Sequence, residues 1–176
     1  FGFGYRTGIE LLGEAAGYTN PPSHWSKTSP FNIPIGHEIL VTPLQMVRAF
    51  AVIANGGYLV KPYIVSRVED QFGVRLKETI PDRKKTDLNP EVAEIMRRVL
   101  TRVVEEGTGK RARIEGIQVA GKTGTAQKVL PDGKGYSDEN FMSSFVGFAP
   151  SDNPKYVMSV VLDDPGPKYY GGTVAA

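Results

Sequence analysis

The sequence predicts an α+β fold in which helices pack against an antiparallel sheet. Helix-like segments occupy the first two thirds of the 176 residues, and three strand-like segments follow one another at the end. Two turn signals, PDGK at 131–134 and SDNP at 151–154, separate those strands. Because short turns join neighbouring antiparallel strands, we expect consecutive hairpins rather than alternating strand–helix–strand units.

The first part of the chain combines a short predicted helix with a long irregular stretch. The glycine-rich opening FGFGYRTG leads to a predicted helix over 7–16, which ends at Gly17. Residues 18–38 are rich in Pro, Ser and Asn and show no periodicity. A loop of this length inside a compact domain is usually functional or wraps a surface.

Two longer helices carry clear start and stop signals. Thr42 is a good N-cap for a helix over 42–55, Pro43 suits its first position, and its apolar interior predicts burial. The next segment, 58–70, alternates well enough for a strand and leads into a polar connector. Asn89 caps a second helix over 90–105, whose predicted amphipathic stripe comprises Val92, Ile95, Val99 and Val103. The three strands are expected over 114–129, 140–149 and 155–163.

Composition excludes several classes of function. The chain is 40% hydrophobic and 23% charged, as in ordinary globular proteins, and its net charge of +2 is too small to indicate nucleic-acid binding. Cysteine is absent, which excludes disulfides and thiolate chemistry. His24 and His37 have no second ligand at metal spacing, so we expect neither a metal nor another cofactor.

The ends of the sequence indicate a piece of a longer protein. It begins with Phe1 rather than Met and stops at GGTVAA, where we expect a new element to begin. No apolar stretch is long enough for a membrane span, and no signal-peptide pattern opens the chain. We expect any membrane tether or secretion signal to lie outside these residues.

Residues 119–128, VAGKTGTAQK, form the clearest candidate site. They place Lys122 on a glycine-flanked backbone beside the hydroxyls of Thr123 and Thr125. On a strand, Lys122 and Gly124 share one face and the threonines share the other. A cation beside hydroxyls and backbone N–H groups suits a carboxylate, and Gly124 would let an extended peptide lie alongside. We therefore expect Lys122 to be exposed rather than directed into the core.

The same region matches a phosphate-binding loop letter for letter. GIQVAGKT at 116–123 fits G-x-x-x-x-G-K-[ST], and the later run VMSVVLDD resembles a magnesium-binding strand end. A phosphate loop needs a helix that begins at the Lys-Thr pair. Here Ile117 and Val119 favour extended backbone, and Gly124 leads toward a turn. A nucleotide hydrolase is therefore an alternative that a hairpin over 116–149 would exclude.

Five stretches of the chain resemble the transpeptidase domain of penicillin-binding proteins, and most closely its monofunctional, class B, cell-division type. They are FGFGYRTGIELLGE, VTPLQMVRAFAVIANGG, AGKTGTAQKV, FVGFAPSDNPKYVMSVVLDDP and KYYGGTVAA. The resemblance covers essentially the whole chain in order. It implies the C-terminal portion of the serine β-lactamase and penicillin-binding transpeptidase fold, with 1–176 as part of one domain truncated at both ends.

The family works with three motifs, S-x-x-K, S-x-N and K-T-G. No S-x-x-K occurs in this sequence. An S-D-N at 151–153 follows K-T-G instead of preceding it and stands just before Pro154, where we interpret it as a turn. The resemblance therefore implies that the nucleophilic serine, its base and the S-x-N motif lie upstream of Phe1.

The resemblance also implies an activity. In the family, the serine attacks the bond between two terminal D-alanines of a peptidoglycan stem peptide, and a neighbouring stem resolves the acyl-enzyme. Penicillins mimic that dipeptide. The implied partners are stem peptides, β-lactams, the rest of the same domain and other wall-synthesis or cell-division proteins, outside the cytoplasm. A non-enzymatic penicillin sensor or partner-binding relative of the same fold is the alternative.

Individual residues take their expected roles from this resemblance. Lys122 would keep the upstream serine–lysine network in its active protonation pattern, and Thr123 and Thr125 would bind the terminal carboxylate beside Gly124. The Thr125 N–H would be one donor to the oxyanion. Tyr169 and Tyr170 match aromatic residues at the lip of the substrate cleft, with plain packing as the alternative. The acidic pairs are interpreted as solvated charges, namely Glu105-Glu106 and Asp163-Asp164.

Overall fold

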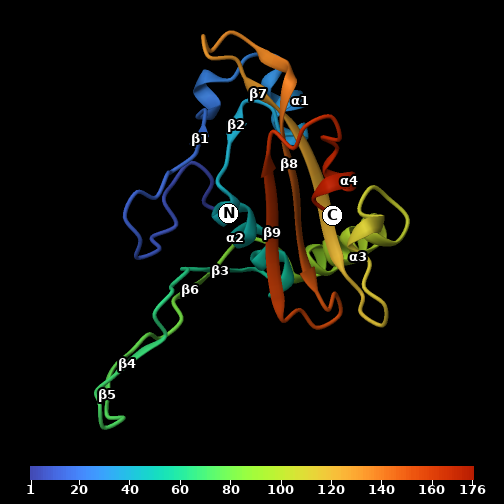
Figure 1. Ribbon diagram of the computed structural model, residues 1–176. Helices are drawn as coiled ribbons and strands as arrows, with labels where there is room; N and C mark the ends of the chain where they lie inside the picture. The colour runs from blue at the N-terminus through green and yellow to red at the C-terminus, as the bar shows by residue number, and fades with distance from the viewer.

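A three-stranded antiparallel sheet forms the centre of the computed structural model, which describes all of residues 1–176 (Figure 1). Its strands, in spatial order, are β7 (Ala120–Val129), β8 (Tyr136–Ala149) and β9 (Tyr156–Asp163). This confirms the predicted hairpin sheet. The first strand starts at Ala120 rather than at residue 114, because the preceding residues turn at Gly116 (φ 76) and form an isolated bridge between Ile114 and Ile117.

The two longer predicted helices are confirmed as α2 (Pro43–Ala54) and α3 (Pro90–Glu105). At the start of α2, the Thr42 hydroxyl accepts the Gln45 N–H, and the Gln45 side chain accepts the Thr42 N–H, which completes a capping box. The Asn89 side chain accepts the Glu91 N–H at the start of α3. These caps satisfy N–H groups that have no partner inside the helix.

The helices bury both faces of the sheet to different extents. One core cluster joins α2 and α3 to β7 and β8 through Phe50, Ala54, Leu100, Ala120, Val146 and Phe148. A second cluster lies on the opposite face, with Val104, Val119, Phe145 and Ala175. Since Ala120 pairs with Phe148 and strand neighbours alternate faces, Val119 and Phe145 must point the other way. α3 therefore lies along the edge of the sheet that β7 forms, and it contributes residues to both clusters.

The stripe predicted on α3 does not face this core. The residues of α3 that are buried against the sheet are Ala93, Leu100, Thr101 and Val104. Val92, Ile95 and Val99 remain 44%, 49% and 49% exposed. The predicted periodicity was therefore present, but it marks a second apolar face that no element of this chain covers.

The predicted helix over 7–16 is wrong. Gly8 and Gly13 adopt φ of 80° and 81°, which a right-handed helix cannot contain. The Glu14 carboxylate instead accepts N–H groups from Thr7 and Gly8, at 2.6 and 3.2 Å, and holds the segment as a loop. The buried Gln45 side chain fastens this region to α2 by donating to the Tyr5 and Ala16 carbonyls.

The rest of the first forty residues forms short elements around a small two-stranded pairing. β1 (Tyr18–Thr19) pairs antiparallel with β2 (Ile39–Leu40). Between them lie α1 and two 3-10 turns, with the bounds Ser29–Asn32, Pro22–His24 and Ile33–Ile35. The long loop predicted over 18–38 thus has some local structure but no long helix or strand.

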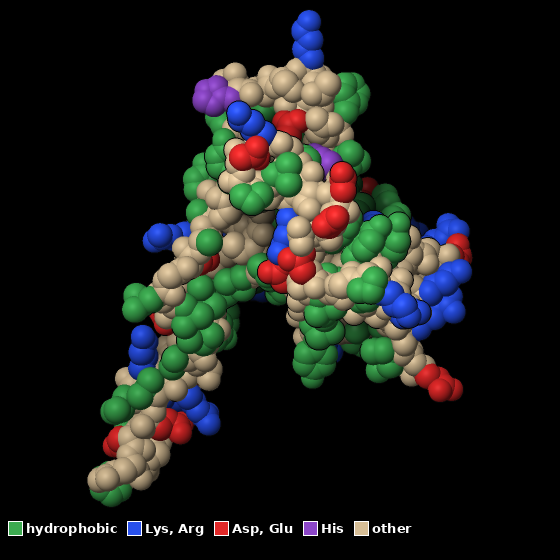
Figure 2. Space-filling model, turned by 45° about the horizontal axis from the view of Figure 1, so that its top comes forward, with side chains coloured by type: hydrophobic (Ala, Val, Ile, Leu, Met, Phe, Trp, Pro, Cys, Tyr) green, Lys and Arg blue, Asp and Glu red, His purple; other side chains and the backbone are tan.

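The predicted strand over 58–70 divides into two, because Pro62 lacks an N–H and interrupts the ladder. β3 (Tyr58–Val60) pairs with β6 (Arg83–Lys85), and β4 (Arg67–Glu69) pairs with β5 (Arg75–Glu78). Together they form an arm that projects from the body of the molecule (Figure 1). Figure 2 shows apolar side chains along this arm, and its exposed members include Ile64, Val68, Phe72, Leu76 and Ile80.

The chain ends beside the central sheet. A 3-10 turn (Lys110–Ala112) follows α3, and the short helix α4 (Gly171–Val174) contacts this turn as well as β7 and β8. The Arg111 guanidinium donates to the Thr173 carbonyl at 2.6 Å and ties the two together. No helix of the chain combines the length and hydropathy needed to cross a bilayer.

Candidate active site on the edge strand

The K-T-G segment lies in the middle of β7, which is an edge strand because only β8 pairs with it. Lys122 pairs with Val146 and is exposed, as the sequence predicted. Its Nζ donates to the Thr123 carbonyl at 2.8 Å. An edge strand presents backbone groups that no neighbouring strand satisfies. The exposed amine of Lys122 and the open backbone edge of β7 therefore belong to the same segment.

The two threonines share the opposite face and are already engaged within the chain. Thr123 pairs with Phe145 across the ladder, and its hydroxyl lies 2.7 Å from the hydroxyl of Thr108. The Thr125 hydroxyl accepts the Gly171 N–H at 2.9 Å. The C-terminal segment thus reaches directly to the K-T-G strand and fixes the side chain of its second threonine.

Two glycines at this site lie close to neighbouring atoms, and one of them, Gly171, lies against the backbone of the sheet. A Cβ on Gly124 would lie 2.5 Å from the Ser144 hydroxyl oxygen on β8. A Cβ on Gly171 would lie 2.6 Å from the Ser144 carbonyl oxygen and closer still to the Gly124 carbonyl oxygen. The Ser144 hydroxyl could rotate away from a Cβ on Gly124, whereas the two carbonyls are fixed in the sheet, so the docking of the C-terminal segment on β7 and β8 requires glycine at 171.

The tyrosines predicted at the cleft lie just before this contact. The Tyr169 carbonyl accepts a hydrogen bond from the Ser143 hydroxyl, which anchors its backbone to β8. The Tyr169 ring is half-buried and lies 4.7 Å from the Tyr170 ring, which is 63% exposed. A hydrogen bond with the Tyr170 side chain raises the pKa of Tyr169 above its ordinary value. The Tyr169 phenol is therefore neutral near pH 7.

A third aromatic residue, Phe141, belongs to the same cluster and was missed from the sequence. Its ring stacks on Tyr169 with centroids 3.9 Å apart and planes 6° from parallel. Phe141 stands at i−2 from Ser143 and i−4 from Phe145 on β8, so all three share the face that carries the threonines. The alternation of residues 141, 143 and 145 is evident in the sequence. The position of Phe141 beside Tyr169 depends on the register of the hairpin.

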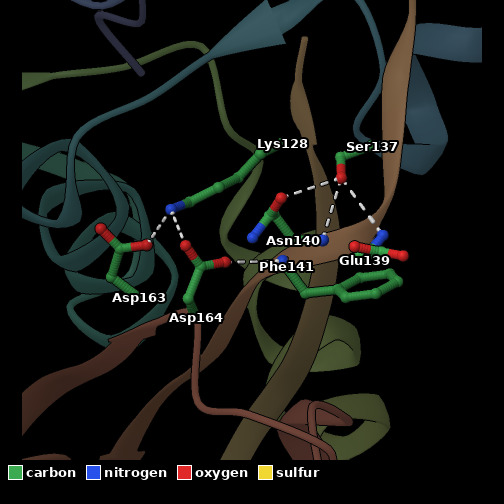
Figure 3. A network of polar contacts seen from close by, with 7 residues as sticks. All are labelled: Lys128, Ser137, Glu139, Asn140, Phe141, Asp163 and Asp164. Carbon is green, nitrogen blue, oxygen red and sulfur yellow. Dashed lines mark hydrogen bonds and ion pairs between the residues drawn. The ribbon is translucent and has the colours of Figure 1, made fainter.

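The two acidic pairs lie at solvent-exposed ends of α3 and β9, as predicted, and three of their four carboxylates make surface ion pairs. Lys128 on β7 makes ion pairs with both Asp163 and Asp164 at the end of β9, and the distance to Asp164 is 2.5 Å (Figure 3). The ion pair with Asp163 and then that with Asp164 raise the pKa of Lys128, and Lys128 lowers the pKa of Asp164. At the end of α3, Glu106 pairs with Arg102 at 2.9 Å.

The phosphate-loop alternative is contradicted by the backbone. Residues 120–129 form an extended strand that pairs antiparallel with β8, and no helix begins at Lys122-Thr123. The run VMSVVLDD pairs antiparallel as well, so no crossover to a parallel strand exists. The S-D-N segment forms a bend between β8 and β9, as predicted. No cluster of three or more His, Asp or Glu side chains is placed to hold a metal ion.

Comparison with known proteins agrees with this geometry. A family model described as penicillin binding protein transpeptidase domain matches residues 1–176, the whole chain. The chain belongs to this family. The stage V sporulation protein D of Bacillus subtilis is 43% identical over 178 residues. The peptidoglycan D,D-transpeptidase FtsI of Escherichia coli is 33% identical over 177 residues.

Solved structures of the family share the fold. Penicillin-binding protein 3 of Mycobacterium tuberculosis, complexed with aztreonam, superposes with a TM-score of 0.85 at 38% identity, covering 93% of this chain and 38% of that one. The transpeptidase domain of Burkholderia pseudomallei penicillin-binding protein 3 superposes with a TM-score of 0.81 at 30% identity. The superposition covers 99% of this chain and 50% of that one. The matches to the two curated relatives cover 100% of this chain. They cover only 27% of the length of the Bacillus subtilis protein and 28% of the length of the Escherichia coli protein.

Proposed function

We propose that these 176 residues are the C-terminal part of a transpeptidase domain in a class B penicillin-binding protein of the cell-division type. The share of the Burkholderia domain that the chain covers, 50%, supports this assignment. The whole protein would be a peptidoglycan D,D-transpeptidase that works through an acyl-serine. This chain would supply the strand that receives the substrate, and residues outside it would supply the nucleophile, its base and the S-x-N motif.

One observation carries the proposal: K-T-G occupies an exposed position on an edge strand, with a second threonine one residue further on. The terminal carboxylate of a D-alanyl-D-alanine stem, or of a β-lactam, needs a cation and hydroxyl donors. Lys122, Thr123 and Thr125 provide both within four residues. Charge-assisted hydrogen bonds of this kind are about twice as strong as neutral ones.

The internal hydrogen bonds of the threonines orient them for this role. A hydroxyl has one donor and two acceptor positions. Because the Thr125 hydroxyl accepts the Gly171 N–H, its own proton is free to be donated to a carboxylate. The Thr123 hydroxyl can likewise accept from Thr108 and donate outward. The C-terminal segment would therefore preorganise the carboxylate site rather than compete with it.

The acyl-transfer step also needs stabilisation of the oxyanion. We assign one donor to the backbone N–H of Thr125 and the second to the nucleophilic serine outside this chain. Loss of one such donor costs roughly 2.7–4 kcal/mol of transition-state stabilisation. Lys122 would add positive potential next to the serine and its base, which favours the deprotonated nucleophile.

Further partners follow from the same assignment. The exposed stripe of Val92, Ile95 and Val99 on α3 would pack against the rest of the transpeptidase domain, because apolar patches of this kind mark interaction surfaces. We expect the protein to act outside the cytoplasm, anchored to the membrane by a segment that lies outside these residues. Tyr169 and Tyr170 would line the lip of the cleft, and other wall-synthesis or division proteins would be partners.

The test is acylation of the full-length protein by a labelled penicillin, with and without Lys122→Ala. We expect the second-order rate to fall on the order of a hundredfold, the scale of a lost electrostatic contact to the transition state. Because Lys122 is exposed, the melting temperature should change little. Lys155→Ala, at another exposed lysine, is the matched control.

Three outcomes separate the alternatives. A parallel loss of acylation and thermal stability would assign Lys122 a structural role. Absence of acylation in the wild type would refute the proposed function. Normal acylation without cross-linking of stem peptides would instead favour the penicillin-sensing alternative.

A further inference from the structure

Lys128 links two strands that are not neighbours in the sheet. It lies on β7, whereas Asp163 and Asp164 lie at the end of β9, and β8 runs between them. The Lys128 side chain is only 30% exposed, and its amine reaches both carboxylates. Figure 3 shows its amine between the two carboxylates. The ion pairs therefore connect the two edge strands, β7 and β9, across β8 at this end of the sheet.

Asp164 transmits this contact to β8. Its carboxylate accepts the Phe141 N–H at 3.0 Å, and its own N–H donates to the Phe141 carbonyl at 3.0 Å. Both backbone groups of Phe141 are thus held by one residue. Asp164 adopts φ 46, an uncommon conformation for a residue with a side chain, which persists only where the surroundings determine it. Here the surroundings are Lys128 and Phe141.

The position of Phe141 depends on these contacts because the ladder is irregular on its other side. Gln127 pairs with Phe141, but the next pair is Val129 with Tyr136, so residues 137–140 leave the ladder. The Ser137 hydroxyl organises this bulge by accepting the N–H groups of Glu139 and Asn140 (Figure 3). On the β9 side, the ladder ends with Met142 paired to Asp163, and Asp164 adds the two hydrogen bonds to Phe141.

The Phe141 ring in turn determines the orientation of the Tyr169 ring, on which it stacks. The two rings stack at 3.9 Å, whereas the Tyr169 backbone is held separately through the Ser143 hydroxyl. Backbone anchoring leaves rotation about the side-chain bonds free, so the stacking partner determines where the ring points. A displaced Phe141 would therefore release the Tyr169 ring without releasing the C-terminal segment.

We propose that Lys128 and Asp164 are positioning residues that fix Phe141 and, through it, the Tyr169 ring for recognition of the acyl donor. This inference rests on the proposed function for its last step. The stacked rings offer an apolar wall beside the carboxylate site, suited to the side chain of a stem peptide or β-lactam. Lys128 does not touch the ligand, and its effect passes through Asp164 and the Phe141 backbone.

The experiment uses full-length protein with 3-fluorotyrosine at position 169, observed by ¹⁹F NMR. Lys128→Met removes the ion pairs, Lys128→Arg preserves them, and Phe141→Leu gives the reference for an unstacked ring. Lys134→Met, at an exposed lysine in the β7–β8 turn, is the control. Acylation by a penicillin is measured on the same proteins without the fluorine label, separating the apparent dissociation constant from the limiting acylation rate.

We expect Lys128→Met to move the fluorine resonance toward that of Phe141→Leu, while the Arg variant and the control keep the wild-type resonance. The apparent dissociation constant should rise about threefold to tenfold, the size of one lost aromatic contact, with the limiting rate unchanged. A wild-type resonance in Lys128→Met would overturn the positioning role even if acylation fell. If the wild type is not acylated but the resonance moves, the proposed function fails and the positioning of the ring stands.

Discussion

At the scale of the residue, hydrogen bonds made by carboxylates hold the loops that surround the sheet. Glu38 adopts φ 60, and its carboxylate accepts from the Ser29 hydroxyl at 2.5 Å and the Asn32 amide at 2.7 Å. The hydrogen bond from Ser29, and then that from Asn32, lowers the pKa of Glu38 below its ordinary value of 4.5. Because a lowered pKa means that the folded chain prefers the charged form, Glu38 stabilises the fold at neutral pH.

This stabilisation should be lost in acid. We expect wild-type protein to melt above Glu38→Gln at pH 7, where the charged carboxylate makes both bonds. The difference should begin to shrink near pH 4.5, the unfolded value, and vanish as pH falls through the lower folded pKa. Melting temperatures of both proteins between pH 7 and pH 3 would measure it. A constant difference across this range would mean that the charge of Glu38 contributes nothing.

Residues adjacent in sequence were easier to predict than residues adjacent only in space. Lys122, Thr123 and Thr125 could be recognised as a site because one strand carries them all, and their spacing fixes their faces. Asp164 could not, because its partner Lys128 is 36 residues away and the contact depends on the hairpin register. The roles of the first three remain predictions that the acylation experiment tests.

At the scale of the element, the docking of α4 on β7 depends on the lack of a side chain at Gly171. Gly171→Ala would push a Cβ against the carbonyls of Gly124 and Ser144, which are held in the sheet ladder. Overpacking of this kind costs typically about 1–3 kcal/mol. We expect a lower melting temperature and slower acylation by penicillin, because the Gly171 N–H would no longer orient Thr125.

Thr173→Ala, in the same short helix, serves as the control for this substitution, since the Thr173 contact to Arg111 uses its backbone carbonyl. Calorimetry and stopped-flow acylation on the full-length variants would give both readouts. Unchanged stability in Gly171→Ala would show that the C-terminal segment does not need this close contact.

The elements that the sequence predicts well are those whose ends carry side-chain signals. α2 and α3 start at Thr42 and Asn89, and both caps form the predicted hydrogen bonds. The segment 7–16 has no such cap, and its two glycines adopt φ values that a helix excludes. Of the arm formed by β3 to β6, the sequence predicted one strand over 58–70, but β5 and β6 were missed because they are exposed along their whole length and carry no buried face.

At the scale of the whole molecule, one apolar face and one protruding arm have no partner within the chain. The face consists of Val92, Ile95 and Val99, which the sequence predicts as part of an amphipathic stripe and which remain exposed in the structure. A hydrophobic pattern predicts that a helix face is buried, but it does not identify the element that covers this face. For a chain that spans about a quarter of its curated relatives, the covering element can lie elsewhere in the protein.

We propose that this chain supplies the substrate-binding strand of an acyl-serine enzyme, and that the nucleophile lies outside it. No serine here stands three residues before a lysine, and an activated serine needs a base within about 2.6–3.2 Å. The most direct measurement is mass spectrometry of the full-length protein after reaction with penicillin, followed by proteolysis and mapping of the modified peptide. We expect one acyl adduct per molecule, on a serine outside residues 1–176. A stoichiometric adduct on any serine within these residues would contradict the account.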